Sequence, residues 1–201
     1  MLDGSRNDGA DSVRLIWPFM RLDGACESWL ECLERAGVSP ARFANPNTRL
    51  PHRMTMHLLR SVANETGDLA VGLCAGELLE PGDLEVIEYA ARAAATLREG
   101  IECAARYLRV LHDSAEITLV PAGELTEWRF RVTDGVPQPP AANDFTIAAA
   151  LAFAHRNAGA ERPVELRFMH ARPRYATKYE RFGAPVSFGA TERATRSRAA
   201  A

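Results

Sequence analysis

The sequence predicts an α+β fold, in which an N-terminal helical part is followed by a β-β-α-β-α-β part with a small, mostly antiparallel sheet covered by helices. A change of apolar period in the middle of the chain carries this prediction. Apolar residues between 97 and 111 recur every three or four positions, whereas those between 117 and 132 alternate with polar residues. Because a two-stranded ribbon is marginal in water, its apolar face must lie on a helix.

Length and composition predict one large domain with short appendages. The chain has 201 residues, 47% of them hydrophobic and 25% charged, and a net charge of −2. This balance is typical of globular proteins and lacks a basic excess that would attract nucleic acid at long range. We expect a disordered lead over residues 1–12, a single domain over residues 13–190 and a flexible Arg- and Ala-rich tail over residues 191–201.

The expected compartment is the cytoplasm. The first residues lack the apolar stretch of a signal peptide, and no apolar run is long enough to span a membrane. The four cysteines show no CxxC spacing, so we expect free, buried thiols in a reducing environment.

Glycine and proline divide the N-terminal half into several short helices. A helix over residues 26–36 should end at Gly37, which suits a left-handed C-cap. Residues 33–43 are similar to a helix-turn-helix, but a recognition helix must be long enough to lie in the major groove. Asn45-Pro46 ends this one within about two turns, so we interpret the segment as a packed helical corner. Further helices are expected after Pro51, over residues 68–79 and from Asp83.

The helix after residue 96 should begin with a capping box. The Thr96 hydroxyl can accept from the backbone N–H of Glu99, and Glu99 can reach back to the cap. After the ribbon, a helix capped by Asn143 or Asp144 is so rich in alanine that a neighbour must pack very close to it. A third strand over residues 164–168, a short helix ending at Gly183 and a strand over residues 185–188 complete the pattern.

Motifs for catalysis are missing from the sequence. There is no glycine-rich phosphate loop, HExxH or GxSxG. His52 and His57 are five residues apart, not the three or four that place two ligands on one helical face. Cys103 and His112 are too far apart along one helix to form a hydrogen bond. We therefore predict no enzymatic activity, no cofactor and no metal.

Aromatic and polar residues of the central helix and the ribbon suggest a small-molecule site. Aromatic side chains could line a space between the two, and cationic or histidine side chains could supply polar contacts, as in many ligand clefts. An ordinary core with a few hydroxyls at its edge is the alternative. The candidate ligand-binding residues are Tyr89, Arg106, Tyr107, His112, Trp128 and Arg131.

Four phrases in a fixed order resemble the N-terminal sensor, called arabinose-binding, of AraC-type bacterial transcription regulators. Together they extend over roughly residues 20–190. The phrases are LERAGVSPARF with NPNTRLP (33–43 and 45–51), TGDLAVGLCAGELLEPGDL (66–84), YAARAAATLREGIECAARYLRVL (89–111) and RFMHARPRYATKYERFGAPVSFGA (167–190).

The resemblance implies that residues 13–190 form a ligand-sensing and dimerisation domain. In that family the sensor precedes a DNA-binding half with two helix-turn-helix units, and its members respond to various small molecules, so arabinose itself is not implied. The sequence ends at Ala201, where that half should begin, which suggests a fragment or a truncated regulator. Expected partners are a small-molecule effector and a second copy or a full-length relative, without specific DNA binding by this chain alone and without a membrane.

Three other functions stay open. The chain could be a ligand-free protein–protein interaction module, or a truncated regulator that acts through mixed dimers. Direct DNA binding through residues 29–43 or the arginine-rich tail is a third possibility. A gel shift that vanishes with modest salt would reduce it to nonspecific charge.

Overall fold

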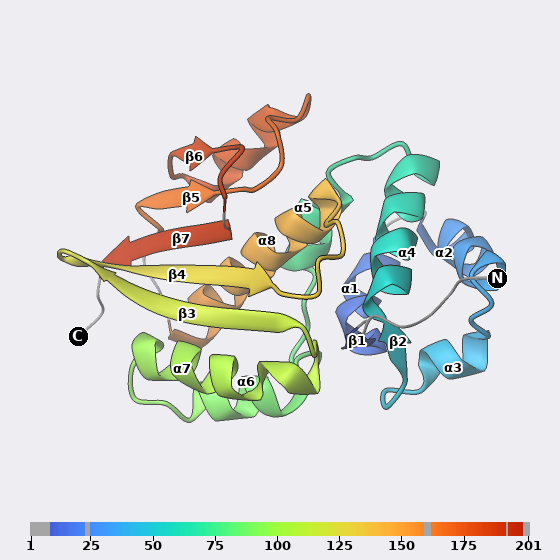
Figure 1. Ribbon diagram of the computed structural model, residues 1–201, viewed down its shortest axis with the longest axis horizontal. Coiled ribbons are helices and arrows are strands. Elements are labelled where there is room, and N and C mark those ends of the chain that lie inside the picture. The colour runs from blue at the N-terminus through green and yellow to red at the C-terminus, as the bar shows by residue number, and fades with distance from the viewer. Residues whose placement is uncertain (1–8, 23–24, 159–161, 192, 199–201) are drawn as a thin grey trace.

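A sheet and a group of helices lie side by side in the computed structural model, which describes residues 9–22, 25–158, 162–191 and 193–198 (Figure 1). The predicted α+β class is confirmed. Helices dominate the first part of the chain, and the strands of the main sheet follow residue 114. None of the described helices is long and apolar enough to cross a membrane.

The helical part opens with a short strand, not with a fully disordered lead. Residues 10–12 form β1 (Ala10–Ser12), which pairs antiparallel with β2 (Arg49–Pro51); residues 1–8 of the expected lead lie outside the described residues. The helices of this part are the 3-10 turn η1 (Val13–Leu15), α1 (Trp17–Met20), α2 (Ala25–Arg35), α3 (Pro40–Ala44), α4 (His52–Glu65), α5 (Val71–Glu77), α6 (Glu85–Arg92), α7 (Leu97–Tyr107) and the 3-10 turn η2 (Leu108–Val110).

The main sheet has the order β3-β4-β7-β5-β6. Every pairing in it is antiparallel except that of β5 with β6, so the predicted mostly antiparallel sheet is confirmed. Its elements in chain order are β3 (Ala115–Ala122), β4 (Leu125–Val132), the long helix α8 (Pro140–Ala158), β5 (Glu165–Arg167), the 3-10 helix η3 (Ala176–Phe182), β6 (Val186–Ser187) and β7 (Arg193–Arg198).

The expectation of a flexible tail is wrong for residues 193–198. They form β7, which lies between β4 and β5 and pairs with both. The tail shows no apolar alternation because Arg193 and Thr195 occupy the inward positions of this strand. Its neighbours on both sides supply backbone hydrogen bonds, so the strand forms without an apolar pattern of its own.

Local signals in the sequence place most helix ends correctly. The Thr96 hydroxyl accepts from the Glu99 N–H at 3.2 Å, as predicted, but Glu99 accepts from the N–H of Ala95 and not from that of the cap residue. Gly37 and Gly183 have φ values of 71° and 62°, in the left-handed region that suits a C-cap. The helix α8 begins earlier than predicted, at Pro140, so Asp144 lies inside the helix.

Two buried apolar clusters meet at α5 and α8. One lies among the N-terminal helices around Phe19, Trp29 and Val62 and includes Phe145 of α8. The other lies on the inner face of the sheet and includes Trp128, Phe130 and Leu166, together with residues of both helices. Because α5 and α8 contribute to both clusters, their contact joins the helical part to the sheet.

The close neighbour predicted by the alanine-rich sequence of α8 is α5. A Cβ atom at Gly72 would lie 2.1 Å from the carbonyl oxygen of Ala141, and one at Gly76 would lie 2.5 Å from the Cβ of Ala148. Real Cβ atoms do not approach other atoms this closely, so both positions require glycine. The two helix backbones therefore touch where their side chains are smallest.

We expect Gly76→Ala to lower the free energy of unfolding by about 1–3 kcal/mol, because the added methyl overpacks the helix contact. The sign is diagnostic, since the same change in an open helix would stabilise by about 1 kcal/mol. Urea unfolding measures the difference, and Glu77→Ala on the exposed side of α5 is the control. A Gly76→Ala protein as stable as the wild type would contradict the close contact.

Candidate ligand-binding site

A buried arginine at the start of β7 is the most unusual group on the inner face of the sheet. Arg193 pairs in register with Phe130 of β4, and its side chain shares the face of Trp128 and Phe130 because strand side chains alternate. Only 1% of the residue is exposed. Burial lowers the pKa of its guanidinium to about 9, so it still carries a positive charge at neutral pH.

Only one of the three guanidinium nitrogens of Arg193 forms a hydrogen bond with another described residue. Its Nη1 donates to Thr146 Oγ1 of α8 at 2.9 Å, and its central carbon lies 4.4 Å from the centre of the Phe130 ring. Nε and Nη2 have no hydrogen-bond partner among the described residues, and none of the ion pairs formed by those residues includes Arg193. The buried guanidinium thus lies against the Phe130 ring, and its Nε and Nη2 edge is free to bind a further acceptor.

Other polar atoms around this arginine are also buried and unpaired. Thr195 Oγ1 lies on the same strand face, two residues along β7, and Asn143 Oδ1 lies one helical turn before Thr146 on α8. Buried polar atoms without partners are rare in folded proteins and need an explanation. A bound polar ligand would supply the missing hydrogen-bond partners here.

A second buried polar cluster lies where β1, the start of α4 and the chain after η2 meet. The carboxylate of Asp11 lies between two histidines, with Oδ2 at 2.8 Å from His52 Nδ1 and Oδ1 at 3.2 Å from His112 Nδ1. The two imidazole rings lie 4.5 Å apart, centre to centre. Burial, together with the charges of His52 and Arg193, lowers the pKa of His112 to about 4 despite Asp11, so this ring is neutral at pH 7. We name these three residues the Asp-His-His cluster.

A third polar group ties the segment after β5 to α8. Asp144, fully buried in the helix, accepts from the hydroxyls of Tyr175 and Tyr179 at 2.9 and 2.6 Å and lies 2.9 Å from Nε2 of His170. Burial and the charge of Asp144 raise the pKa of both tyrosines, so both stay protonated as donors. Burial by itself would lower the pKa of His170, but its hydrogen bonds to Asp144 and to the Ala171 carbonyl, together with the charge of Asp144, outweigh burial and raise the pKa.

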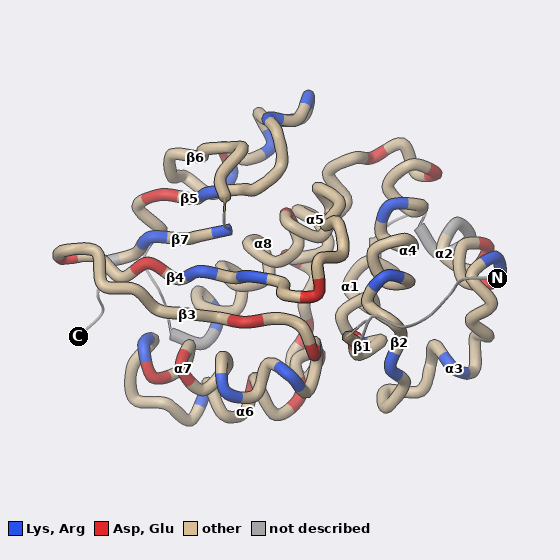
Figure 2. The backbone as a smooth tube through the Cα atoms, in the orientation of Figure 1, with Lys and Arg blue, Asp and Glu red and all other residues tan. Residues whose placement is uncertain are grey.

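The outer face of the sheet carries charges in pairs. Glu127 of β4 accepts from Arg129 at 2.5 Å and from Arg196 at 2.6 Å, and it also contacts Arg167 of β5. Figure 2 shows charged positions of both signs along β4 and β5 and basic positions along β7. Burial alone would raise the pKa of Glu127, but these arginines lower it. In contrast to Arg193, Arg196 on the same strand is paired with carboxylates, those of Glu127 and Glu165.

The structure separates the six residues that the sequence suggested for ligand binding. His112 and Trp128 come together, since their rings lie 6.4 and 6.0 Å from that of Phe130. Tyr89 on α6 is 67% exposed, and Tyr107 is more than a third exposed on α7. Arg131 lies on the outer face, where it donates to Glu116 at 2.7 Å. The six as one ligand-binding set stay a prediction.

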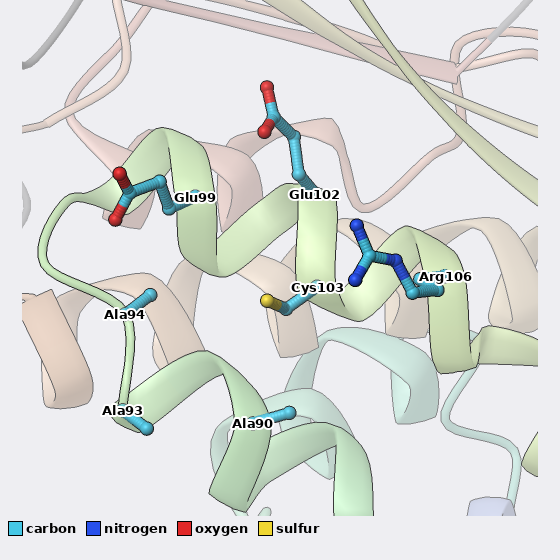
Figure 3. A pocket seen from close by; sticks show the side chains of 7 residues that line it. All are labelled: Ala90, Ala93, Ala94, Glu99, Glu102, Cys103 and Arg106. Atoms are coloured by element: carbon cyan, nitrogen blue, oxygen red, sulfur yellow. The ribbon is translucent and has the colours of Figure 1, made fainter.

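Arg106 lines a different feature, an open groove of about 380 Å³ between α6 and α7 (Figure 3). Cys103 of α7 points towards α6, and three alanines of α6 and the following turn form the other wall, while Glu102 points away from them. The groove is shallow and none of its lining atoms is buried without a partner. It therefore lacks the unpaired polar groups that mark the surroundings of Arg193.

Sequence reasoning missed Arg193, Asp11 and His52. The sequence pattern places Arg193 in the tail because the last residues alternate arginine with small residues. The Asp-His-His cluster joins residues 11, 52 and 112, and spacing along the chain cannot reveal contacts that the fold makes over such separations. The one signal in the sequence is Asp11 itself, an acidic residue just before the apolar segment that begins at Val13.

Comparisons with known proteins now define what kind of domain this is. The chain is a domain of a transcription regulator: a family model described as the arabinose-binding domain of AraC transcription regulators, N-terminal, matches residues 29–201. The chain belongs to this family. No curated protein matches it in sequence.

A solved structure shares the fold. The crystal structure of the transcriptional regulator CdpR from Pseudomonas aeruginosa matches with a TM-score of 0.60 at 18% sequence identity, over 89% of this chain and 56% of that chain. At this identity the match shows a common fold only. The chain spans little more than half the length of that regulator.

Replacement of Asp144 tests how the segment after β5 is held. We expect Asp144→Asn to lower the free energy of unfolding by about 3 kcal/mol, because breaking a buried, hydrogen-bonded charge cluster leaves its partners unsatisfied. The control is Glu77→Gln, which weakens an exposed pair with Arg181 and should cost less than about 1 kcal/mol.

The pH dependence supplies a second readout of the same change. Because the pKa of folded His170 is raised, its contribution to stability is complete below its unfolded pKa of about 6.5 and is lost as pH rises through the folded pKa. Wild-type protein should lose this contribution as the pH rises above about 6.5, and Asp144→Asn protein should not. The free energy of unfolding is measured by urea at a series of pH values. If the His170 contact contributed nothing, it would change with pH equally in the wild type and in Asp144→Asn.

Proposed function

We propose that this chain is the effector-sensing and dimerisation domain of an AraC-type regulator, and that its effector carries an anionic group bound by Arg193. Membership in the family supports the regulatory role. The observation that supports the anionic effector is a buried guanidinium that no described carboxylate neutralises.

The open edge of the guanidinium matches a carboxylate. Nε and Nη2 point along one side of the planar fork, and they are the two nitrogens without a partner among the residues described. A carboxylate can accept from both at once in a bidentate pair, which is the strongest common arrangement for arginine. Burying a charge without a partner is costly, so an anion at this edge would recover much of that cost.

The surroundings suit an effector that also has an apolar part. The Phe130 ring lies against the guanidinium, and Trp128 lies 6.0 Å from that ring. Thr195, opposite Trp128 in the sheet, and Asn143, one helical turn before Thr146, carry buried polar atoms without hydrogen-bond partners among the described residues. Of the residues predicted from sequence, this proposal keeps Trp128 in the effector site. A carboxylate with an apolar body, such as an amino acid or a short fatty acid, has the right chemistry.

The position of Arg193 suggests how binding could reach the output half. The site lies on β7, a strand held between β4 and β5, and the family is described as N-terminal in its regulators. A DNA-binding half would then come after β7 in the chain. Because Arg193 is almost fully buried, an effector could enter only if β7 and α8 moved apart, and this movement would be transmitted to the DNA-binding half.

Dimer formation belongs to the same proposal and rests on the family. A second copy or a full-length relative would be the partner, in the cytoplasm where such regulators act. A domain that only mediates protein–protein contact, without an effector, is the alternative function.

Ligand screening by thermal shift tests the effector. An anionic effector at a hundred times its dissociation constant should add about 2.7 kcal/mol of stability to the wild type, while neutral sugars and amines should add none. Arg193→Gln should abolish the response and remain folded, because it removes an uncompensated buried charge.

The matched control is Arg196→Gln, three residues along the same strand and on its outer face. It should keep the response, since Arg196 is paired with Glu127 and Glu165. A response that persists in Arg193→Gln would rule out this arginine as the anchor. If no carboxylate, amino acid or fatty acid stabilises the wild type, the interaction module becomes the better account.

A further inference from the structure

We propose that Asp11, His52 and His112 form a binding site for a divalent transition-metal ion, with Zn²⁺ as the best-suited occupant. The three residues come from β1, the first turn of α4 and the residue pair after η2. All three are buried. This inference does not depend on the effector proposed above.

The donor atoms have the separation that such an ion needs. One oxygen or nitrogen from each residue lies within 4.8 Å of the other two. The Asp11 carboxylate contacts both imidazoles, with Oδ2 at 2.8 Å from His52 Nδ1 and Oδ1 at 3.2 Å from His112 Nδ1. Tetrahedral Zn²⁺ with ligands at about 2.0–2.1 Å holds neighbouring donors roughly 3.3 Å apart. Small movements of the two rings would therefore close the site around an ion.

Unpaired atoms inside the cluster point to a missing partner. Asp11 Oδ1 and His112 Nδ1 lie 3.2 Å apart but are not oriented for a hydrogen bond, and neither has another hydrogen-bond partner in the described part of the chain. The exposed fractions of these two side chains are 1% and 9%. A cation between the oxygen and the nitrogen would satisfy both at once. The neutral form of His112, which its burial favours, is also the form that binds metals.

Charges around the cluster favour a cation on balance. The carboxylate of Asp134 lies 4.0 Å from His52 Nε2, on the side of the ring away from Asp11, and its buried Oδ2 lacks a hydrogen-bond partner among the described groups. Arg193 is the positive charge that opposes a cation, since it lowers the pKa of His112. Two buried carboxylates outweigh this single arginine.

The far side of His52 carries a second contact of the kind found around metal-bound histidines. Nε2 of this ring lies 2.8 Å from the side-chain amide of Gln138. A half-turn of that amide would bring its oxygen to Nε2–H when Nδ1 binds the ion, and it would give up the present bond to Val136. Such outer contacts fix the orientation of a ligating histidine.

An ion here would join three distant parts of the chain. It would hold β1 and the start of α4 against the entrance to β3, at the boundary between the helical part and the sheet. Three protein ligands leave a fourth position for water, as in open zinc sites. We therefore expect the metal to stabilise the domain and to bind with a stoichiometry of one.

Titration of the whole chain with Co²⁺ and Zn²⁺ after treatment with a chelator tests the site. Co²⁺ should give the visible absorption of a tetrahedral complex at one equivalent, and Zn²⁺ should displace it and raise the melting temperature. His112→Gln and His52→Gln should each weaken binding by at least about 10–100-fold, which is the loss seen when only an outer contact of a metal site is removed. His57→Gln, at an exposed position of α4, should bind as the wild type does.

The folded state of each variant is checked by circular dichroism in chelator before metal is added. His112→Gln should fold, because its amide can pair with Asp11 in place of the imidazole. Wild-type affinity in that variant would overturn the proposal, and so would the absence of a saturable Co²⁺ spectrum in the wild type. Equal loss of binding in His57→Gln would reassign the ion to another site.

Discussion

Close packing between α5 and α8 is the contact on which the rest of this fold depends. At Gly72 and Gly76 the two backbones approach each other so closely that no side chain fits between them, and this approach brings α8 into both apolar clusters. From that position α8 presents Asp144 to the segment after β5 and Thr146 to β7. A wider separation of the helices would move both groups away from their partners.

The inner face of the sheet is unusually polar for the covered face of a small sheet. Its apolar residues, such as Trp128 and Phe130, share the space with Arg193, with Asp144 and with the Asp-His-His cluster. Of these, the Asp144 group is well satisfied by its tyrosines and His170, so it acts as a structural anchor. Arg193 and the cluster keep unpaired atoms. Buried polar groups that are satisfied specify a fold, whereas unsatisfied ones indicate where a ligand could bind.

Sequence reasoning was most successful where the signal is local. The Thr96 cap, the left-handed glycines, the ribbon of β3 and β4 and the alanine-rich α8 all depend on residues a few positions apart, and the structure has them. It failed at β7, where arginine and threonine fill inward positions. A strand between two others is held by backbone hydrogen bonds that require no apolar side chains. It also failed at the Asp-His-His cluster, whose members meet only after the helical part folds back onto the sheet.

Electrostatic coupling links the two buried polar sites. The positive charge of Arg193 is close enough to lower the pKa of His112, so the same charge must weaken the attraction of the cluster for any cation. An anion bound at Arg193 would cancel that charge and strengthen cation binding at the cluster. Thermodynamic linkage then requires that a bound metal ion strengthens anion binding by the same factor. The Phe130 ring neighbours both the Arg193 guanidinium and the His112 ring. Because both groups lie beside this one side chain, a charge bound at either site would change the electrostatic potential at the other.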